Sequence, residues 1–306
     1  MKPYSEMSKE ELASLKEQLT AVYKEYQGKN LSLNMARGKP SPDQLDLSLP
    51  MLDVLNSKSD FMTADGDVRN YGVLTGIQEA KELMGGMMDA PAENVIMYGS
   101  ASLTLMYDTV SRSYTHGVMG NTPWCKLDKV KFLCPVPGYD RHFAITQFFG
   151  IEMINIPLHE DGPDMDLVEQ YVNNDEAVKG IWCVPLYSNP SGQCYSDEVV
   201  KRFANLKPAA KDFRIYECEK AGNPDMVYKF GSTAKVTFPG AGISAIATSK
   251  ANIEDIKKQM NNQLISHDKI NQLRHVRFFK NLDGIKAHMA KHAELLRPRF
   301  EAVDEI

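Results

Sequence analysis

The sequence predicts an α/β fold in which a mostly parallel sheet is covered by helices on both faces. Short apolar runs alternate with helical patterns from about residue 76 to residue 250. The runs are apolar at consecutive positions, which is typical of strands buried on both faces. Strands separated by helices indicate parallel units with helical crossovers. The 306 residues, 43% of them hydrophobic, are enough for one large domain of this kind.

The first predicted element is an amphipathic helix over residues 8–26. Its apolar positions recur at intervals of three and four, and Ser8 with Glu11 forms a capping box at its start. A loop containing Gly38 is expected over residues 36–42, where prolines and glycine interrupt regular structure. The apolar positions of the helix are Leu12, Leu15, Leu19, Val22 and Tyr26.

Strands and helices then alternate along the chain. Strands are expected at 95–98, 130–133, 152–156, 181–184, 213–216, 227–230 and 243–247. Helices are expected at 76–88, 103–114, 139–149, between 156 and 181, and at 196–205, where Ser196 is the cap. After about residue 251 the strand patterns end, and helices are expected at 252–264, 269–279 and 284–306.

Net charge, apolar runs and cysteine spacing limit the classes of partner and the cellular location that the sequence predicts. The formal net charge of −5 gives no electrostatic reason to expect nucleic acid or an anionic membrane surface. No apolar run approaches the roughly 20 residues of a membrane span, and the N-terminus has no apolar stretch that resembles a signal peptide. The five cysteines form no CxxC pair, so free thiols in the cytoplasm are predicted rather than disulfides or a metal site.

The strongest local signal is the turn around Asn189, in the run Tyr187-Ser188-Asn189-Pro190-Ser191-Gly192. It directly follows the strand predicted at 181–184. Ligands of open α/β sheets bind beyond the carboxyl ends of the strands, and this turn occupies such a place. Taken by itself, the same run also fits an ordinary Asn-Pro turn.

A second signal is the run of small residues Gly99-Ser100-Ala101-Ser102 between a strand and a helix. Such a turn leaves backbone N–H groups free to hold a phosphate at a helix N-terminus. The glycine spacing of dinucleotide-binding and P-loop sites is absent, which argues against a nicotinamide-dependent oxidoreductase. The alternative for these residues is an ordinary serine N-cap.

A third signal is Lys235, which lies just past a strand in a turn rich in Ser and Thr. A partly desolvated lysine can act as a nucleophile toward a carbonyl carbon. In isolation, a solvated surface lysine is the commoner reading of such a residue.

Together the three signals resemble fold-type I pyridoxal-phosphate enzymes. In more detail, the chain resembles a class I-related aspartate aminotransferase group that includes alanine–glyoxylate-type members. The resemblance implies a three-layer large domain that binds pyridoxal 5′-phosphate, and matching strings run almost end to end. These strings are residues 36–42 (ARGKPSP), 69–72 (RNYG), 135–143 (PVPGYDRHF), 180–185 (GIWCVP), 238–242 (FPGAG) and 271–279 (NQLRHVRFF).

The resemblance assigns roles around the cofactor. Lys235 matches the lysine that holds the cofactor covalently and transfers the proton, and Asn189 matches the side chain bonded to the phenolic oxygen. Tyr139 matches the aromatic residue that stacks on the ring, and Ser232 matches a hydroxyl that binds the phosphate.

Other positions complete the implied site. Ser100, Ala101 and Ser102 match the phosphate loop, and Gly38 matches the glycine of the substrate-side loop. Tyr71 matches the tyrosine that reaches the phosphate of the neighbouring subunit, so the resemblance implies a homodimer. The implied substrates are an amino acid, such as aspartate, and a 2-oxo acid.

The chain departs from this pattern after the strand at 213–216. The family places there an aspartate that pairs with the pyridine nitrogen, whereas this chain has Glu217 and Glu219, which we expect to be solvated turn residues. The connection over residues 217–225 is shorter than the dozen or so residues of a parallel crossover, so an internal deletion is predicted, and an antiparallel return would fit the short connection.

The second departure is the C-terminal end. Relatives continue into a small domain with an arginine for the substrate carboxylate, whereas this sequence stops within a helical pattern. The predicted organisation is an N-terminal helix and loop (1–48), a large cofactor-binding domain (49–265) and the helical start of a truncated domain (266–306). The predicted function is an impaired aminotransferase, and the alternative is an inactive paralogue that binds pyridoxal phosphate or phosphate without turnover.

Overall fold

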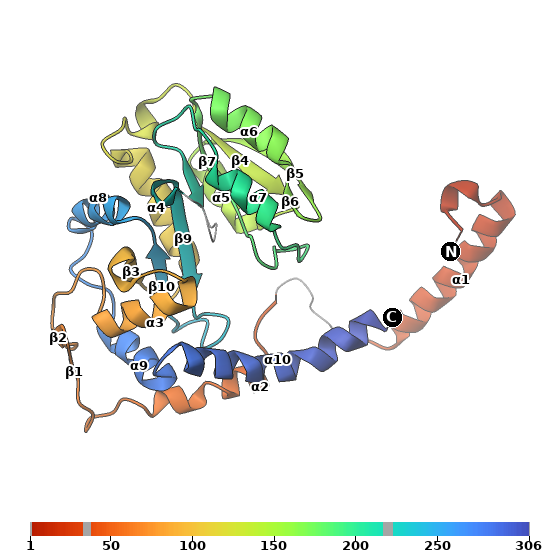
Figure 1. Ribbon diagram of the computed structural model, residues 1–306. Coiled ribbons are helices and arrows are strands. Elements are labelled where there is room, and N and C mark those ends of the chain that lie inside the picture. The colour runs from red at the N-terminus through yellow and green to blue at the C-terminus, as the bar shows by residue number, and fades with distance from the viewer. Residues whose placement is uncertain (1, 33–37, 217–222, 306) are drawn as a thin grey trace. The chain divides into compact units, whose positions relative to one another are not determined.

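The computed structural model describes residues 2–32, 38–216 and 223–305, and its contacts divide it into two compact units, Met1–Ser41 and Pro42–Ile306 (Figure 1). The first unit contains the turn η1 (Tyr4–Glu6) and helix α1 (Lys9–Gly28). The Ser8 hydroxyl accepts from the Glu11 amide, and the Glu11 carboxylate accepts from the Ser8 amide. The predicted helix and its capping box are therefore confirmed, and the unit buries none of the helix's side chains.

Among the described residues, eight strands of the second unit form one sheet, in the order β3-β10-β9-β8-β7-β4-β5-β6. All of them except β6, which was not predicted, match the predicted runs within a few residues. The strands are β3 (Val95–Tyr98), β4 (Lys131–Val136), β5 (Glu152–His159), β6 (Gly162–Pro163), β7 (Val178–Trp182), β8 (Arg214–Tyr216), β9 (Val227–Ser232) and β10 (Ser244–Ala247). A separate hairpin joins β1 (Met62–Thr63) to β2 (Gly66–Asp67).

The sheet is mostly parallel. Strands β5, β4, β7, β8 and β9 run the same way, while β10 is antiparallel to both β9 and β3, and β6 is antiparallel to β5. The antiparallel return expected between β8 and β9 is therefore wrong. Strand β8 has only three residues, and Ile215 pairs with Val227 in parallel register.

Helices cover both faces of the sheet, which confirms the three-layer architecture. Neighbouring strand residues point to opposite faces, so Phe132 contributes to one apolar cluster and Leu133 to another. One face carries α4 (Ser102–His116), α5 (Asp140–Phe148) and α8 (Lys250–Met260). The other face carries α6 (Met165–Asn174) and α7 (Asp197–Ala204), and further along α3 (Gln78–Met88) and α9 (Lys269–Phe279).

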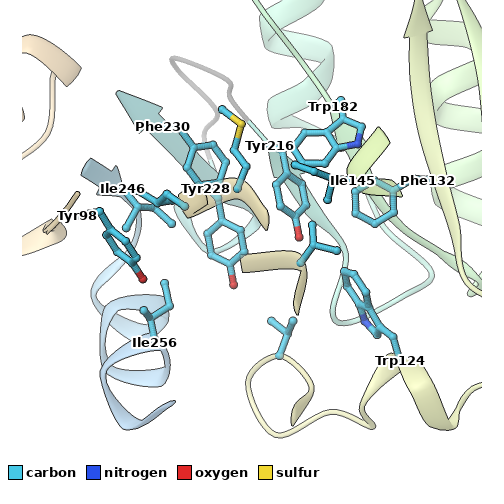
Figure 2. Close-up of a cluster of buried hydrophobic side chains, with 14 of the residues drawn as sticks. Tyr98, Trp124, Phe132, Ile145, Trp182, Tyr216, Tyr228, Phe230, Ile246 and Ile256 are labelled. Carbon is cyan, nitrogen blue, oxygen red and sulfur yellow. The ribbon is translucent and has the colours of Figure 1, made fainter. Parts of the chain in front are cut away.

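The largest buried cluster is aromatic and lies between the sheet and the layer of α4, α5 and α8. Tyr216 stands near its centre, with ring centroids 5.4 Å from Phe132 and 4.7 Å from Trp182 (Figure 2). Side chains of six neighbouring strands, from β3 to β4, meet in this cluster, with Tyr98 and Ile246 toward one side and Trp124, from the segment before β4, toward the other. Packing in this cluster therefore holds these strands in place relative to one another, with the carboxyl ends of all but the antiparallel β10 side by side.

A buried ion pair links β7 to the segment before β8. The Lys179 ammonium lies 2.7 Å from the Asp212 carboxylate, and the Trp124 indole N–H donates to the other carboxylate oxygen at 2.8 Å. The Lys179 and Asp212 side chains are only 10% and 5% exposed. Each buried charge thus has a partner, which is the condition for its burial to be tolerated.

Two long elements complete the second unit. Helices α9 and α10 (Leu282–Asp304) form as predicted, and α10 packs on α9 and α3. Helix α2 (Pro42–Asp46) begins inside the stretch predicted as loop, because a proline is tolerated at the first position of a helix. The predicted domain boundaries at residues 48 and 265 stay predictions. No helix among the described residues is long and apolar enough to cross a membrane.

Candidate functional site

The candidate site lies at one edge of the sheet, where several strands end in the same direction. Strand β10 pairs antiparallel with both neighbours, and Ser244 lies opposite Tyr98 on one side and Ser232 on the other. The ends of β3 and β9 are therefore level and about 10 Å apart, which is two strand spacings. The parallel strands β8, β7 and β4 end at this same edge.

The turn after β3 has the features of an anion site. The Ser244 hydroxyl donates to the Gly99 carbonyl at 2.7 Å, which anchors the turn to the sheet. Ala101 is the N-cap of α4, and no side chain of the described residues caps this helix. The Thr104 N–H donates to the Ala101 carbonyl, whereas the N–H groups at the start of the helix, at Ser102 and Leu103, can face an anion, and the dipole of the helix favours one.

The turn after β9 presents Lys235 at the surface. The Ser232 hydroxyl accepts from the Ala234 amide at 3.0 Å, and the Lys235 side chain is exposed. Thr233 is fully buried, and its hydroxyl accepts from the Ile243 amide at 3.0 Å. The backbone on the N-terminal side of Lys235 is thus fixed while the amino group remains accessible.

Asn189 and Tyr139 follow the ends of β7 and β4 at the same edge. Asn189 is exposed, and Tyr139 is the N-cap residue of α5. A small pocket here is lined by Tyr139, His142, Trp182 and Ser188, among others. The structure therefore brings the predicted phosphate turn, Lys235, Asn189 and Tyr139 to a single edge of the sheet.

Sequence reasoning left His142 unassigned, and the structure places it directly behind Tyr139. The buried His142 ring stacks on Trp182 with centroids 4.6 Å apart and meets the Tyr139 ring edge-on at 5.1 Å. The Trp182 indole N–H donates to the Thr146 hydroxyl at 2.8 Å. Tyr139 is thus supported by a packed stack that no spacing in the sequence indicated.

His275 is a second functional candidate that the sequence did not single out. Its Nδ1 lies 2.8 Å from the Asn271 carbonyl and must donate to it, so Nε2, 3.1 Å from the Thr233 hydroxyl, is the acceptor of a neutral ring. Asn271 also donates to the Ala241 and Gly242 carbonyls. Helix α9 therefore holds both sides of the loop that contains Lys235.

Four further predicted positions are not among the residues described at this edge. Tyr71 is 82% exposed, and its backbone is held by the Lys269 ammonium, which donates to the Tyr71 carbonyl at 3.3 Å. Gly38 is exposed and belongs to the first unit. Glu217 and Glu219 lie outside the described residues. Among the described residues, no group of three or more His, Cys, Asp or Glu side chains is placed to hold a metal ion.

The buried histidines predict a loss of stability in mild acid. Burial lowers the pKa of both His142 and His275 from 6.5 to about 4. The unfolded chain therefore takes up protons below pH 6.5 that the folded protein does not, so stability present above pH 6.5 is lost as the pH falls toward 4. At pH 5 we expect each histidine to lower the free energy of unfolding by about 2 kcal/mol.

Urea unfolding at pH 7.5 and pH 5 measures this effect. The variant His142→Phe keeps an aromatic ring against Trp182 and should reduce the pH-dependent decrease by about 2 kcal/mol. Equal stability of the parent protein at both pH values would show that the folded rings accept protons freely.

Comparison with known proteins identifies the family. The sequence model of the family described as aspartate amino-transferase matches residues 7–219 and 215–306. The chain belongs to the aspartate aminotransferase family. It is 41% identical to an aspartate aminotransferase of Corynebacterium glutamicum, covering 97% of this chain and 74% of that protein. It is also 42% identical to an aminotransferase of Mycolicibacterium smegmatis, covering 99% of this chain and 77% of the relative.

Solved structures of aminotransferases share the fold. The crystal structure of an aspartate transaminase from Corynebacterium glutamicum superposes with a TM-score of 0.92 at 40% identity, covering 98% of this chain and 76% of that one. LysN, an α-aminoadipate aminotransferase of Thermus thermophilus complexed with N-(5′-phosphopyridoxyl)-L-leucine, has a TM-score of 0.66 at 16% identity. It covers 88% of this chain and 70% of that one, and at this identity the likeness shows the fold alone.

The comparisons also support an internal deletion in this member of the aspartate aminotransferase family. The alignments with the two relatives run over 328 and 321 residues, more than the 306 of this chain, so each relative has residues without a counterpart here. The two matches to the family model meet at residues 215–219. The change from one match to the other thus lies at the connection after β8, where the sequence predicts a deletion.

Proposed function

We propose that this chain is a pyridoxal-phosphate-dependent aminotransferase that acts between an amino acid, such as aspartate, and a 2-oxo acid. The chain belongs to the aspartate aminotransferase family, and the main support for the proposal is that two of its turns lie at the same level of the sheet. The phosphate turn after β3 and the lysine turn after β9 lie level on either side of Ser244. A phosphorylated aldehyde would need an anion site and an exposed amine on one sheet edge, and this register supports that arrangement.

The described residues fit the cofactor. The first turn of α4 and the Ser232 hydroxyl would hold the phosphate, and Lys235 would hold the aldehyde carbon. Asn189 would bond the phenolic oxygen, and Tyr139, backed by His142, would face the ring. The bound cofactor supplies an electron sink. The chain itself supplies binding, orientation and the Lys235 amine as proton carrier.

An amino-transfer assay tests the proposal. Protein incubated with pyridoxal phosphate, aspartate and 2-oxoglutarate should form glutamate more slowly than an intact family member, because the deletion after β8 removes residues beside the site. Replacement of aspartate by other amino acids then defines the donor. Glutamate formation no faster than in protein-free controls, with every donor tried, would reject catalysis.

The second candidate is a protein that binds pyridoxal phosphate without turnover. The break of the family match at residues 215–219 favours it, because the resemblance places the carboxylate for the pyridine nitrogen in that connection. A charge-assisted hydrogen bond of this kind contributes about 1.5–3 kcal/mol, so its loss weakens the electron sink. Cofactor binding without amino transfer, even in a single turnover, would identify this case.

We also propose that the chain forms a homodimer in which Tyr71 reaches the phosphate site of the partner. The exposed Tyr71 side chain, on a backbone held by Lys269, supports this. Light scattering at micromolar concentration should give twice the mass of the chain, and Tyr71→Phe should weaken cofactor binding while the dimer persists. A monomer at that concentration would contradict the proposal.

We further propose a cytoplasmic location. Thiols that form no disulfide among the described residues, at Cys125, Cys134 and Cys194, support it.

A further inference from the structure

Two buried histidines lie within hydrogen-bond distance of the backbone carbonyl of Val236, the residue that follows Lys235. The Val236 carbonyl oxygen lies 2.7 Å from Nε2 of His288 and 3.1 Å from Nε2 of His292. Both histidines belong to α10, four residues apart on one face, and each is 6% exposed. The Ser48 hydroxyl approaches the same oxygen at 3.4 Å.

The donors and acceptors define the protonation of this pair. A carbonyl oxygen has two lone pairs, so it can accept an N–H from each ring. Nδ1 of His292 is buried and has no hydrogen-bond partner among the described residues, so a proton there would be unsatisfied. Burial, and then the neighbouring His292, lower the pKa of His288. Nε2 is therefore the nitrogen through which each ring can donate to the Val236 carbonyl.

Helix α9 fixes the donor geometry independently of the carbonyl. The His288 ring packs edge-on against Phe278 at 5.2 Å and Phe279 at 5.5 Å. It also meets the His292 ring at 4.9 Å between centroids. The rings cannot easily turn away, so they are preorganised donors, which lose little rotational freedom when they bond to the carbonyl.

The hydrogen bonds to the Val236 carbonyl fix the orientation of a peptide plane next to Lys235. The Val236 carbonyl and the Thr237 N–H belong to one peptide unit, and that N–H donates to the Thr233 carbonyl at 2.9 Å. On the other side of Lys235, Thr233 is held by His275. Described histidines from α9 and α10 therefore bracket Lys235 from both sides.

We propose that His288 and His292 are positioning residues for Lys235. By donating to the Val236 carbonyl they fix the lysine turn and tie it to α10, so that a shift of α10 along its axis changes the orientation of the Lys235 amine. This inference rests on the proposed role of Lys235. It goes beyond that role, because neither histidine is among the residues proposed to contact the cofactor.

Paired variants test the inference. The double variant His288→Leu/His292→Leu removes both donors, whereas His288→Gln/His292→Gln places an amide N–H near each lost Nε2. Met289→Ala, 48% exposed between them on α10, is the matched control. The readouts are amide hydrogen exchange at Thr237 in cofactor-free protein and the rate at which Lys235 captures pyridoxal phosphate.

The leucine pair should exchange Thr237 about tenfold faster and capture the cofactor about tenfold more slowly, as expected for loss of one or two net hydrogen bonds. The glutamine pair should lie within about threefold of the parent, and Met289→Ala should match it. Unchanged exchange in the leucine pair, or no rescue by glutamine when both pairs remain folded, would overturn the inference. If the parent captures no cofactor, the proposed function fails, whereas the exchange comparison still decides the role of the histidines.

Discussion

Replacing Lys235 by alanine is expected to abolish the absorbance band that pyridoxal phosphate gains when it binds the protein. Lys235 is exposed at the end of β9, level with the phosphate turn, so it is the amine that this edge presents to the aldehyde. The phosphate turn remains in the variant, so weak non-covalent binding should persist. Titration with the cofactor, followed by absorbance, measures the change.

Lys250→Ala is the matched control for this experiment. Lys250 is also exposed and also follows a strand, but β10 runs opposite to β9, so Lys250 lies at the other edge of the sheet. This control should keep the full band. An equal band in Lys235→Ala and in the parent would show that Lys235 is not the residue that binds the cofactor covalently.

Asp212→Ala is expected to lower the free energy of unfolding by about 3–5 kcal/mol, because it leaves the Lys179 ammonium buried without its carboxylate. The same change removes the acceptor of the Trp124 indole N–H. Urea unfolding followed by tryptophan fluorescence would measure the loss. By contrast, Glu254→Ala breaks the exposed pair with Lys257 and should cost at most about 1 kcal/mol.

The double variant Lys179→Met/Asp212→Leu separates lost pairing from lost packing. Because it removes both charges, it should recover most of the stability that Asp212→Ala loses. A loss in Asp212→Ala no greater than in Glu254→Ala would show that water reaches Lys179 and that the pair is not buried in solution.

The fold was largely predictable from local patterns. The strand at Val95–Tyr98 and the helix at Lys269–Phe279 were predicted with their observed bounds, because apolar runs and helical periodicity are local signals. Strand β6 was missed, because a two-residue edge strand containing Pro163 leaves no period to detect. The direction of β9 was mispredicted because it depends on pairing with β8, which is not encoded in either run.

The site was predictable only where its residues follow strands directly. Asn189, Lys235 and the phosphate turn were proposed because each follows a predicted strand end, and Tyr139 was proposed from the family resemblance. His142, His275 and the α10 histidines were not, because their roles depend on contacts between segments far apart in the chain. His288 meets Val236 across 52 residues, and His275 meets Thr233 across 42. Single histidines on helices look the same whether they support a core or a site.

The most direct test of the account is to map where pyridoxal phosphate attaches. The protein is incubated with the cofactor and treated with borohydride, which makes a lysine–pyridoxyl bond permanent, and its peptides are then identified by mass spectrometry. The account predicts one labelled lysine per chain, Lys235, at a cofactor concentration that leaves Lys250 unlabelled. Labelling spread over exposed lysines in proportion to their accessibility, or no label on Lys235, would contradict it.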